Sequence, residues 1–280
     1  MFKIYTFEAQ KAGKHILILG AVHGNEIAGT IAQQNIINQI ENNMIHLKSG
    51  KITFVPIVNE KAHQIDERFV DVNLNRVIKY HQNPANNEEK IANELIKLIE
   101  ECDIMLDLHS THCPDDVPFA FIDYPYEKNR ELLSLIPVKT ALAGWPQIYA
   151  NQPDITNFCT EEYAHQHNKS GITVECGYHK AEKSIDIATT TILNILSYFD
   201  VIEYEKPQKS NPTVITLSSY ITKKSEGKLT RNFQHLDKIQ KDDILAIYES
   251  GEIVTAPFDG YIIIPNHKAT IGSEWFYLGQ

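Results

Sequence analysis

The sequence predicts an α/β protein with a small all-β domain at the C-terminal end of the chain. In residues 14–199, short β-branched apolar runs alternate with segments whose apolar side chains recur every three or four positions. This alternation of strand and helix patterns indicates a sheet with helices on its faces. After a polar, linker-like stretch at residues 203–212, short apolar runs are separated by turn residues, as in a β domain. We therefore divide the chain into domains at residues 1–204 and 205–280.

The composition is typical of a soluble globular protein, with 42% hydrophobic and 22% charged residues among 280. The formal net charge of −10 argues against a nucleic-acid-binding surface. The longest apolar runs are too short to span a bilayer, and the N-terminal residues lack the pattern of a signal peptide. The four cysteines show no C-x-x-C spacing, which indicates free thiols in a reducing compartment. We expect a cytoplasmic protein with neither a nucleic-acid nor a membrane partner.

The first part of the chain has a strand, a helix and a second strand. Residues 14–22 form an apolar run that predicts a buried strand, and residues 26–44 predict a helix with apolar side chains four positions apart. These side chains are Ala28, Ala32, Ile36 and Ile40. Residues 52–58 predict a second strand, with a proline near its end. Residues 59–83 are polar and have no clear period, and a loop of this length is usually functional or disordered.

The middle of the chain carries a capped helix and two further strands. Asn86 followed by Glu89 is a helix N-cap signature, and apolar residues then recur along one helical face. Residues 103–108 predict the third strand, which ends on His109, and residues 117–122 predict another.

The pattern is less regular after that point. Residues 130–168 contain three prolines and predict only a short helix at residues 131–136. Residues 171–176 predict a further strand, and residues 185–199 carry the apolar spacing of a last long helix. Short strands are expected in the β domain at residues 213–217, 244–248, 253–256, 261–264 and 275–278.

Two metal-capable side chains lie in the turn after the first strand. His23 and Glu26 are separated by two residues, and zinc accepts both imidazole nitrogen and carboxylate oxygen. Catalytic zinc sites take three protein ligands, so a third is expected at the C-terminal end of another strand. His109 fits this position, and Asp107 lies on the same face of the strand as a partner for it. A hydrogen-bonded structural histidine is the alternative, which the presence of His23 and Glu26 at a strand end disfavours.

Hydrolysis at such a metal needs a base and an anchor for the substrate. Glu175 ends a predicted strand and suits proton transfer, although a solvated carboxylate is the common role for a single glutamate there. Asn75 and Arg76 offer an amide and a guanidinium fork that matches a carboxylate. Arg68 in the same loop could polarise a carbonyl group and stabilise an oxyanion. Surface arginines in a polar loop are the alternative.

Four motifs occur in order along the chain, namely HGNE at residues 23–26, ERFVDVNLNR at 67–76, DLHST at 107–111 and VECG at 174–177. Together they resemble the succinylglutamate desuccinylase/aspartoacylase family, which belongs to the zinc carboxypeptidase-like group. The resemblance implies a zinc-carboxypeptidase-like mixed sheet flanked by helices. It also implies that residues 1–204 form the catalytic domain of a zinc hydrolase, to which the small β domain is added.

The resemblance also implies a role for each candidate residue. One zinc ion per chain would be held by His23, Glu26 and His109. Glu175 would be the general base, and later the acid that protonates the leaving amine. Arg68 would stabilise the tetrahedral oxyanion, while Asn75 and Arg76 would hold a substrate carboxylate. The implied reaction is hydrolysis of an amide next to a carboxylate-bearing carbon, as in an N-acyl amino acid.

The sequence departs from the family at two points. Aspartoacylase-type members have a further arginine shortly before the general base, which grips a second carboxylate, whereas residues 141–174 contain no arginine. His165, His167 and Lys169 occupy this stretch, where a lysine or a protonated histidine could substitute, although neither offers the fixed fork of an arginine. A dicarboxylate such as N-acetylaspartate or succinylglutamate is therefore in question as the substrate. The C-terminal tyrosine of aspartoacylases has no clear counterpart either, and we assign neither Tyr261 nor Tyr277 to it.

We therefore predict a zinc amidohydrolase that acts on a small N-acyl amino acid or a related amide. A carboxypeptidase-like activity on short peptides is the alternative, because Asn75 and Arg76 would hold a C-terminal carboxylate equally well. A metal-binding or ligand-binding protein without catalysis is the other alternative, which the presence of Glu175 and Arg68 disfavours. The β domain is expected to pack against the catalytic domain, to shape the mouth of the site or to mediate homo-oligomer formation.

Overall fold

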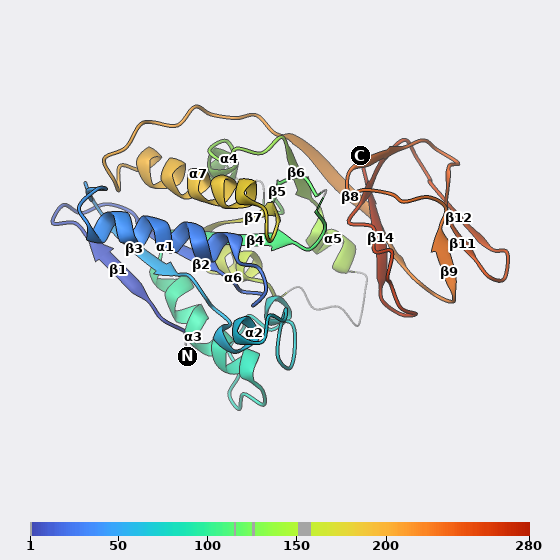
Figure 1. Cartoon of the computed structure of the whole chain (residues 1–280), viewed down its shortest axis with the longest axis horizontal. Coiled ribbons are helices and arrows are strands. Elements are labelled where there is room, and N and C mark those ends of the chain that lie inside the picture. The colour runs from blue at the N-terminus through green and yellow to red at the C-terminus, as the bar shows by residue number, and fades with distance from the viewer. Residues whose placement is uncertain (1, 115, 125–126, 151–157) are drawn as a thin grey trace. The chain divides into compact units, whose positions relative to one another are not determined.

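The computed structural model describes residues 2–114, 116–124, 127–150 and 158–280 (Figure 1). The chain divides into two units, one made of Met1–Ala141 and Asp154–Thr213, the other of Leu142–Pro153 and Val214–Gln280. Alternating strands and helices in the first unit and antiparallel strands in the second confirm the predicted fold class. The division into functional domains at residue 204 stays a prediction.

A mixed sheet with the strand order β1-β3-β2-β4-β7-β5 forms the centre of the first unit. The strands are β1 (Tyr5–Glu8), β2 (His15–Gly20), β3 (Lys51–Val55), β4 (Ile104–Thr111), β5 (Phe119–Phe121) and β7 (Ser170–Tyr178). Strands β2, β3, β4 and β7 are parallel, whereas β1 and β5 are antiparallel to their neighbours. The carboxyl ends of the parallel strands therefore meet at one edge, where open α/β sheets place their ligands.

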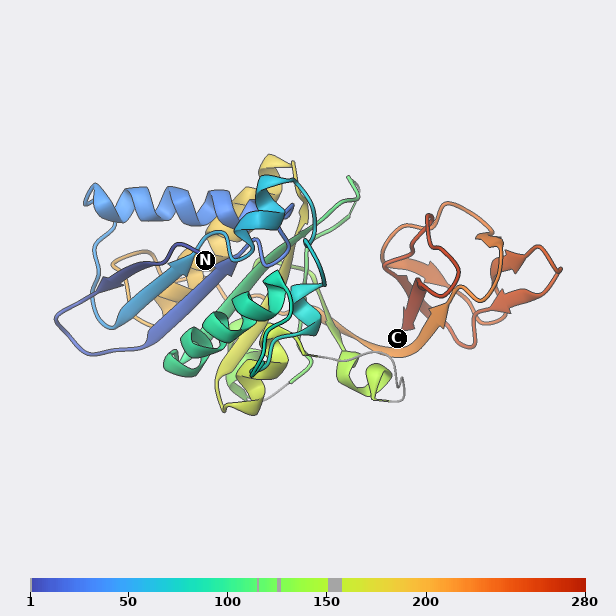
Figure 2. The ribbon, with the colours of Figure 1, turned by 90° about the horizontal axis from the view of Figure 1, so that it is seen from below.

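Helices cover both faces of this sheet, as Figure 2 shows. Helices α1 (Ala28–Glu41) and α7 (Glu182–Tyr198) pack on one face, and α3 (Asn87–Glu101) and α6 (Thr160–Gln166) pack on the other. Because both faces are covered, the central strands are fully buried, which explains the uninterrupted apolar run at residues 16–19. Among the described helices, none combines the length and the apolar character needed to cross a membrane.

Two local predictions about the helices are confirmed, but helix α1 (Ala28–Glu41) is shorter at both ends than the predicted residues 26–44. The predicted apolar stripe of α1 is buried, and the side chain of Asn86 caps α3 by accepting the N–H of Glu89. Helix α1 begins only at Ala28, later than predicted. The preceding residues form a turn, which is closed by the Glu26 N–H donating to the carbonyl oxygen of His23.

The two stretches without a clear period contain short elements. The loop at residues 59–83 holds α2 (Glu60–Gln64) and the 3-10 helix η1 (Leu74–Arg76). The irregular region after residue 124 holds α4 (Glu127–Leu133), β6 (Thr140–Ala143), α5 (Trp145–Tyr149) and α6. The predicted helix at residues 131–136 was wrong in its bounds, because Ile136 precedes a proline, which disfavours the α conformation at that residue. Residues 151–157, which include the third proline of this region, lie outside the described residues.

The second unit consists of antiparallel strands around an aromatic core. Its strands are β8 (Thr213–Thr222), β9 (Gly227–Leu229), β10 (Asp237–Ile239), β11 (Ile244–Tyr248), β12 (Ile253–Thr255), β13 (Gly260–Ile263) and β14 (Glu274–Gly279). They pair in the orders β8-β14-β13-β10 and β12-β11-β9, and the three-residue strands β9 and β10 were not predicted. Helix α5 belongs to this unit, because the hydroxyl groups of Tyr149 and Tyr277 are hydrogen-bonded at 2.8 Å.

The polar stretch at residues 203–212 is attached to the first unit, although the sequence predicted a linker. The Ser210 N–H donates to the carbonyl oxygen of Ser134 at 2.7 Å, and its hydroxyl donates to that of Ile136 at 2.8 Å. The hydroxyl of Ser197 donates to the carbonyl oxygen of Glu205 at 2.8 Å. The side chain of Ser210, which could be solvated in a linker, here binds a backbone group of the first unit, which the composition alone does not reveal.

Candidate metal centre and active site

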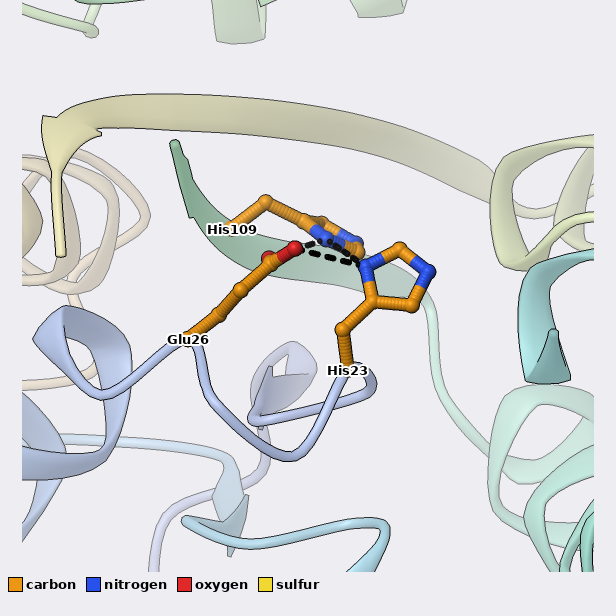
Figure 3. Close-up of side chains that lie close together, drawn as sticks. All are labelled: His23, Glu26 and His109. Carbon is orange, nitrogen blue, oxygen red and sulfur yellow. Dashed lines mark hydrogen bonds and ion pairs between the residues drawn. The ribbon is translucent and has the colours of Figure 1, made fainter. Parts of the chain in front are cut away.

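His23, Glu26 and His109 converge at the carboxyl ends of β2 and β4, and all three side chains are buried (Figure 3). Nδ1 of His23 lies 2.8 Å from Oε1 of Glu26, and Nδ1 of His109 lies 2.7 Å from Oε2. The two Nδ1 atoms are 3.1 Å apart. The three residues predicted as metal ligands are therefore brought together, with their potential ligand atoms within 4.8 Å of one another.

The turn that carries His23 and Glu26 depends on a glycine. A Cβ atom at Gly24 would lie 2.3 Å from the backbone carbon of Ala62 and from the backbone nitrogen of His63. Only glycine therefore allows this close approach of the turn to helix α2. Nδ1 of His63 also lies 2.7 Å from the carbonyl oxygen of Gly24, so the turn is held to the helix by a hydrogen bond.

Hydrogen bonds on the far side of each imidazole orient the two histidines. Nε2 of His23 lies 3.0 Å from Oδ1 of Asn73, and Nε2 of His109 lies 3.0 Å from Oδ2 of Asp107. The hydroxyl of Thr160 in turn donates to the same Asp107 oxygen at 2.5 Å. Because amide and carboxylate oxygens only accept, both Nε2 atoms carry a proton, and both Nδ1 atoms face Glu26.

This donor set fits a divalent cation. Burial, followed by the charge of Arg68, lowers the pKa of His23 to about 4, so that its imidazole is neutral. Burial opposes ionisation of Glu26, yet the two histidines hold its pKa well below the ordinary value. Burial likewise opposes protonation of His109, but Asp107 and Glu26 raise its pKa well above the ordinary value. Cation binding between these atoms is therefore expected to release a proton, and two imidazoles with one carboxylate match the ligands of zinc sites.

Glu175 lies next to this cluster. It is the register partner of His109 in the parallel pair of β4 and β7, so the two side chains lie on the same face of the sheet. Among the described residues, no group hydrogen-bonds its buried Oε2 atom. Burial, followed by the negative charge of Glu26, raises the pKa of Glu175 to about 8. A carboxyl group with this pKa can both take and return a proton near neutral pH.

The predicted substrate residues lie in one loop, next to the metal-ligand cluster at the carboxyl ends of the parallel strands. Nη1 of Arg68 donates to Oε1 of Glu26 at 2.8 Å, and the Arg68 side chain is half exposed. Asn75 is buried, and its Oδ1 accepts the N–H of Thr160 at 3.2 Å. The guanidinium of Arg76 donates through Nη1 to the carbonyl oxygen of Asn75 at 3.0 Å. The structure thus brings Arg68 and Asn75 to the metal-ligand cluster, with Arg76 beside Asn75.

The basic residues that stand where the family has a further arginine lie elsewhere. His165, His167 and Lys169 are at or beyond the C-terminal end of α6, whereas Thr160, at its first residue, contacts Asn75. The seven residues of the helix separate its two ends by about 10 Å. The rings of His165 and His167 stack on neighbouring tyrosine rings, both with centroids 4.0 Å apart. The structure therefore does not bring these three side chains to the site.

Sequence reasoning did not identify three residues that support the cluster. Asn73 orients His23, Thr160 holds Asp107, and the backbone N–H of Ser110 donates to Oε2 of Glu26 at 3.1 Å. Asn73 lies within the ERFVDVNLNR motif, so its place in that loop was a usable signal. Ser110 likewise lies within the DLHST motif, but Thr160 lies in none of the four motifs, and its hydroxyl becomes significant only once its neighbours are known.

Residues 12–199 match the model of the succinylglutamate desuccinylase/aspartoacylase catalytic domain. The chain belongs to this family. The family is one of hydrolases, and the match confirms the resemblance seen in the four sequence motifs. No curated protein matches the chain.

Solved structures with the family's fold cover nearly the whole chain. A succinylglutamate desuccinylase/aspartoacylase from Rhodobacter sphaeroides is similar with a TM-score of 0.79 at 16% identity, over 100% of this chain and 89% of that one. The product-bound ectoine utilization protein EutE (DoeB) from Ruegeria pomeroyi has a TM-score of 0.77 at 20% identity, over 99% and 88%. A succinylglutamate desuccinylase from Vibrio parahaemolyticus has a TM-score of 0.75 at 18% identity, over 99% and 85%. These similarities confirm the predicted fold, including its C-terminal β region.

Proposed function

We propose that this member of the family is a zinc-dependent amidohydrolase, which cleaves the linear amide of a small N-acyl amino acid or a related carboxylate-bearing substrate. The observation that carries the proposal is the buried convergence of His23, Glu26 and His109 beside Oε2 of Glu175, an oxygen to which no described residue hydrogen-bonds. Two buried imidazole Nδ1 atoms and one buried carboxylate form a donor set that suits a divalent cation, which would displace the proton of His109. The family description supports the substrate class.

His23, Glu26 and His109 would hold one zinc ion through Nδ1, a carboxylate oxygen and Nδ1. When bound, zinc supplies Lewis acidity, which polarises a carbonyl oxygen and lowers the pKa of water. Manganese or cobalt accept the same donors, because affinity order alone does not select the metal in a cell.

Glu175 acts as the general base and then as the general acid. Its Oε2 takes a proton from the attacking water and later delivers that proton to the leaving amine. Burial, followed by the charge of Glu26, raises the pKa of Glu175 to about 8, so both its ionised and its protonated forms are populated near neutral pH. Oε2 is the buried atom of this partly exposed side chain, so the proton is held at an oxygen that is shielded from bulk water.

The substrate is bound by the loop that carries the two arginines. Arg68 is half exposed and contacts Glu26, from which position its guanidinium can donate to the oxyanion of the tetrahedral intermediate. Asn75 and Arg76 hold the carboxylate of the substrate through charge-assisted hydrogen bonds. The C-terminal carboxylate of a short peptide would also fit Asn75 and Arg76, so the substrate test must include peptides.

The acyl group is proposed to be neutral. Residues 141–174 contain no arginine, and residues 151–157 contain no basic residue at all. The structure places His165, His167 and Lys169 at the far end of α6. A substrate with a single carboxylate, on its amino-acid side, matches the arginine loop without requiring a second anion-binding group.

A cytoplasmic location is proposed with this function. The four cysteines, which all lie among the described residues, form no disulfide, which is typical of proteins in a reducing compartment. The proposed partner is the small-molecule substrate.

Amine release by the zinc-loaded protein tests the proposal. The panel contains N-formyl, N-acetyl and N-succinyl amino acids, together with short peptides that have free C-termini. We expect turnover of an N-formyl or N-acetyl amino acid above that of the N-succinyl compounds and peptides. Preference for peptides would replace the proposal with a carboxypeptidase activity, and zinc binding without turnover of any substrate would favour a binding protein.

A further inference from the structure

Glu88 is a fully buried carboxylate on the first turn of α3, and it points into the loop that carries the proposed substrate residues. Its Oε1 accepts the backbone N–H of Val70 at 2.9 Å, and its Oε2 accepts those of Asp71 at 3.1 Å and Val72 at 3.4 Å. The side-chain amide of Asn59 also donates to Oε1, at 2.9 Å. Three successive backbone N–H groups thus converge on one carboxylate.

This arrangement explains why a polar stretch without a period has a defined conformation. The backbone N–H groups of residues 70–72 have no acceptor in a helix or sheet ladder and donate to the buried Glu88 carboxylate instead. Burial alone would raise the pKa of Glu88, but its hydrogen bonds to Asn59 and the loop backbone lower it below the ordinary value. The carboxylate is therefore ionised, and its position at the N-terminal end of α3 favours the negative charge further. A buried charge of this kind depends on its donors, so the loop is held in the one conformation that supplies them.

The Glu88-bound backbone separates the two groups of candidate substrate residues. Arg68 precedes Val70 by two residues, and Asn75 follows Val72 by three. Between them, Oδ1 of Asn73 accepts both the Nε2–H of His23 and the backbone N–H of Asn75. A displacement of the residues bound to Glu88 would therefore also displace Arg68 and Arg76, which lie on either side of them in the sequence.

We propose that Glu88 is a positioning residue for substrate binding, which sets the conformation of residues 68–76 through the backbone N–H groups of Val70, Asp71 and Val72. Glu88 itself touches neither the substrate nor the metal ligands. The inference rests on the proposed function, because it assigns the loop to substrate binding. It also makes a claim about loop structure that can be measured without any substrate.

The test compares Glu88→Gln with Glu89→Gln. Glutamine has the size of Glu88, but its NH2 group would face either the backbone N–H groups or the side-chain amide of Asn59, all of which are hydrogen-bond donors. Glu89 is the next residue of the same helical turn, and its Oε2 accepts the N–H of Ala85 outside the loop, at 2.6 Å. The readouts are zinc content, hydrogen exchange of the amides of residues 70–72, and KM and kcat on the best amide substrate.

In the Glu88→Gln variant, we expect full zinc content, faster amide exchange confined to residues 68–76 and a KM raised by about 10- to 100-fold, the usual effect of a misplaced binding group. kcat should also fall, because Arg68 lies in the displaced loop, but by less than KM rises, because Glu175 and the three proposed metal ligands lie outside that loop. Glu88→Asp keeps the charge but loses reach, and it should give an intermediate KM. Glu89→Gln should match the parent in all readouts.

A Glu88→Gln variant with the amide exchange and KM of the parent would overturn the inference. If that variant does not fold, the same comparison is made with Glu88→Asp, for which parental exchange and KM would be equally contrary. If the parent protein hydrolyses no amide, the proposed function fails, but the exchange of residues 70–72 still decides whether Glu88 sets the loop.

Discussion

The hydroxyl of Thr160 donates to Oδ2 of Asp107 at 2.5 Å, and this oxygen lies 3.0 Å from Nε2 of His109. The first residue of α6 is thereby connected to a proposed metal ligand on β4. Groups that orient a ligating histidine raise its basicity and hold the ring in place. The contact between Thr160 and Asp107 therefore has a measurable consequence for metal affinity.

Thr160→Val should weaken zinc binding by about tenfold, as is usual when the partner of a ligating histidine is disturbed. Valine keeps the shape of threonine but cannot donate to Asp107, and the backbone N–H of Thr160 still reaches Asn75. Competition with a chelator of known affinity measures the effect. Thr160→Ser is the control and should bind zinc as the parent does. Equal affinity in the valine variant would show that the hydroxyl does not support the site.

Glu175→Gln should lower kcat by about 10²- to 10⁴-fold, the usual contribution of a general acid–base group, while zinc content stays unchanged. The amide cannot accept the proton of water, although it fills the same space. Metal analysis and steady-state kinetics on the same preparation measure the two quantities. A variant that hydrolyses substrate like the parent would remove Glu175 from the role of base.

Arg76→Ala should raise KM by about 10- to 100-fold with little change in kcat, because a charge-assisted carboxylate contact is worth about 1.5–3 kcal/mol. The matched control is the same substrate as its carboxamide, which lacks the charge that Arg76 would bind. The parent should bind this neutral analogue weakly, and the variant should bind it no worse than the parent does. An unchanged KM for the acid substrate would exclude Arg76 from the substrate site.

The second unit should lose stability as the pH falls from about 6.5 to about 4. Burial lowers the pKa of His235 from 6.5 to about 4, and its Nδ1 accepts the N–H of Ile264 at 3.1 Å. Between pH 6.5 and pH 4, His235 binds a proton in the unfolded chain but stays neutral in the folded unit. The contribution of His235 to the free energy of unfolding is therefore fully present above pH 6.5 and is lost on acidification. The free energy of unfolding should fall by less than about 3 kcal/mol, the limit set by the pKa difference, because the ring is partly exposed to solvent.

Fluorescence-detected urea unfolding checks this pH dependence, because both tryptophans of the chain, Trp145 and Trp275, belong to the second unit. His235→Asn keeps an acceptor for the Ile264 N–H but does not titrate, so its stability should change less over the same pH range. Parallel pH profiles for the variant and the parent would show that His235 is not responsible.

The strand, helix and motif patterns predicted the fold class and the residues of the candidate site. Strand and helix periods depend on neighbours two to four positions apart, so the buried stripe of α1 and the cap at Asn86 could be identified locally. His23 and Glu26 share one turn, and His109 could be found because parallel strands end at a common edge. Their roles as zinc ligands stay a proposal, as do those of Glu175, Arg68, Asn75 and Arg76.

Other features depended on contacts between residues that are distant in the sequence. The placement of His165 and His167 away from the site follows from the direction of α6, which no local pattern reveals. Residues 142–150 join the second unit because Tyr149 meets Tyr277, 128 positions later. The residues at 203–212 attach to the first unit through the hydroxyl of Ser210, which would be equally suited to a linker, and through a hydrogen bond from Ser197 of α7 to Glu205.

By itself, the sequence determined which side chains could bind a metal, move a proton or hold a carboxylate, because these capacities belong to single residues and short motifs. The tertiary structure alone decided that both histidines present Nδ1, that Asn73, Asp107 and Thr160 support them, and that Glu88 gathers the N–H groups of the arginine loop. The physical reason is that a hydrogen bond depends on distances of about 3 Å between groups. In this site, such groups are brought together only when the helices pack on the sheet.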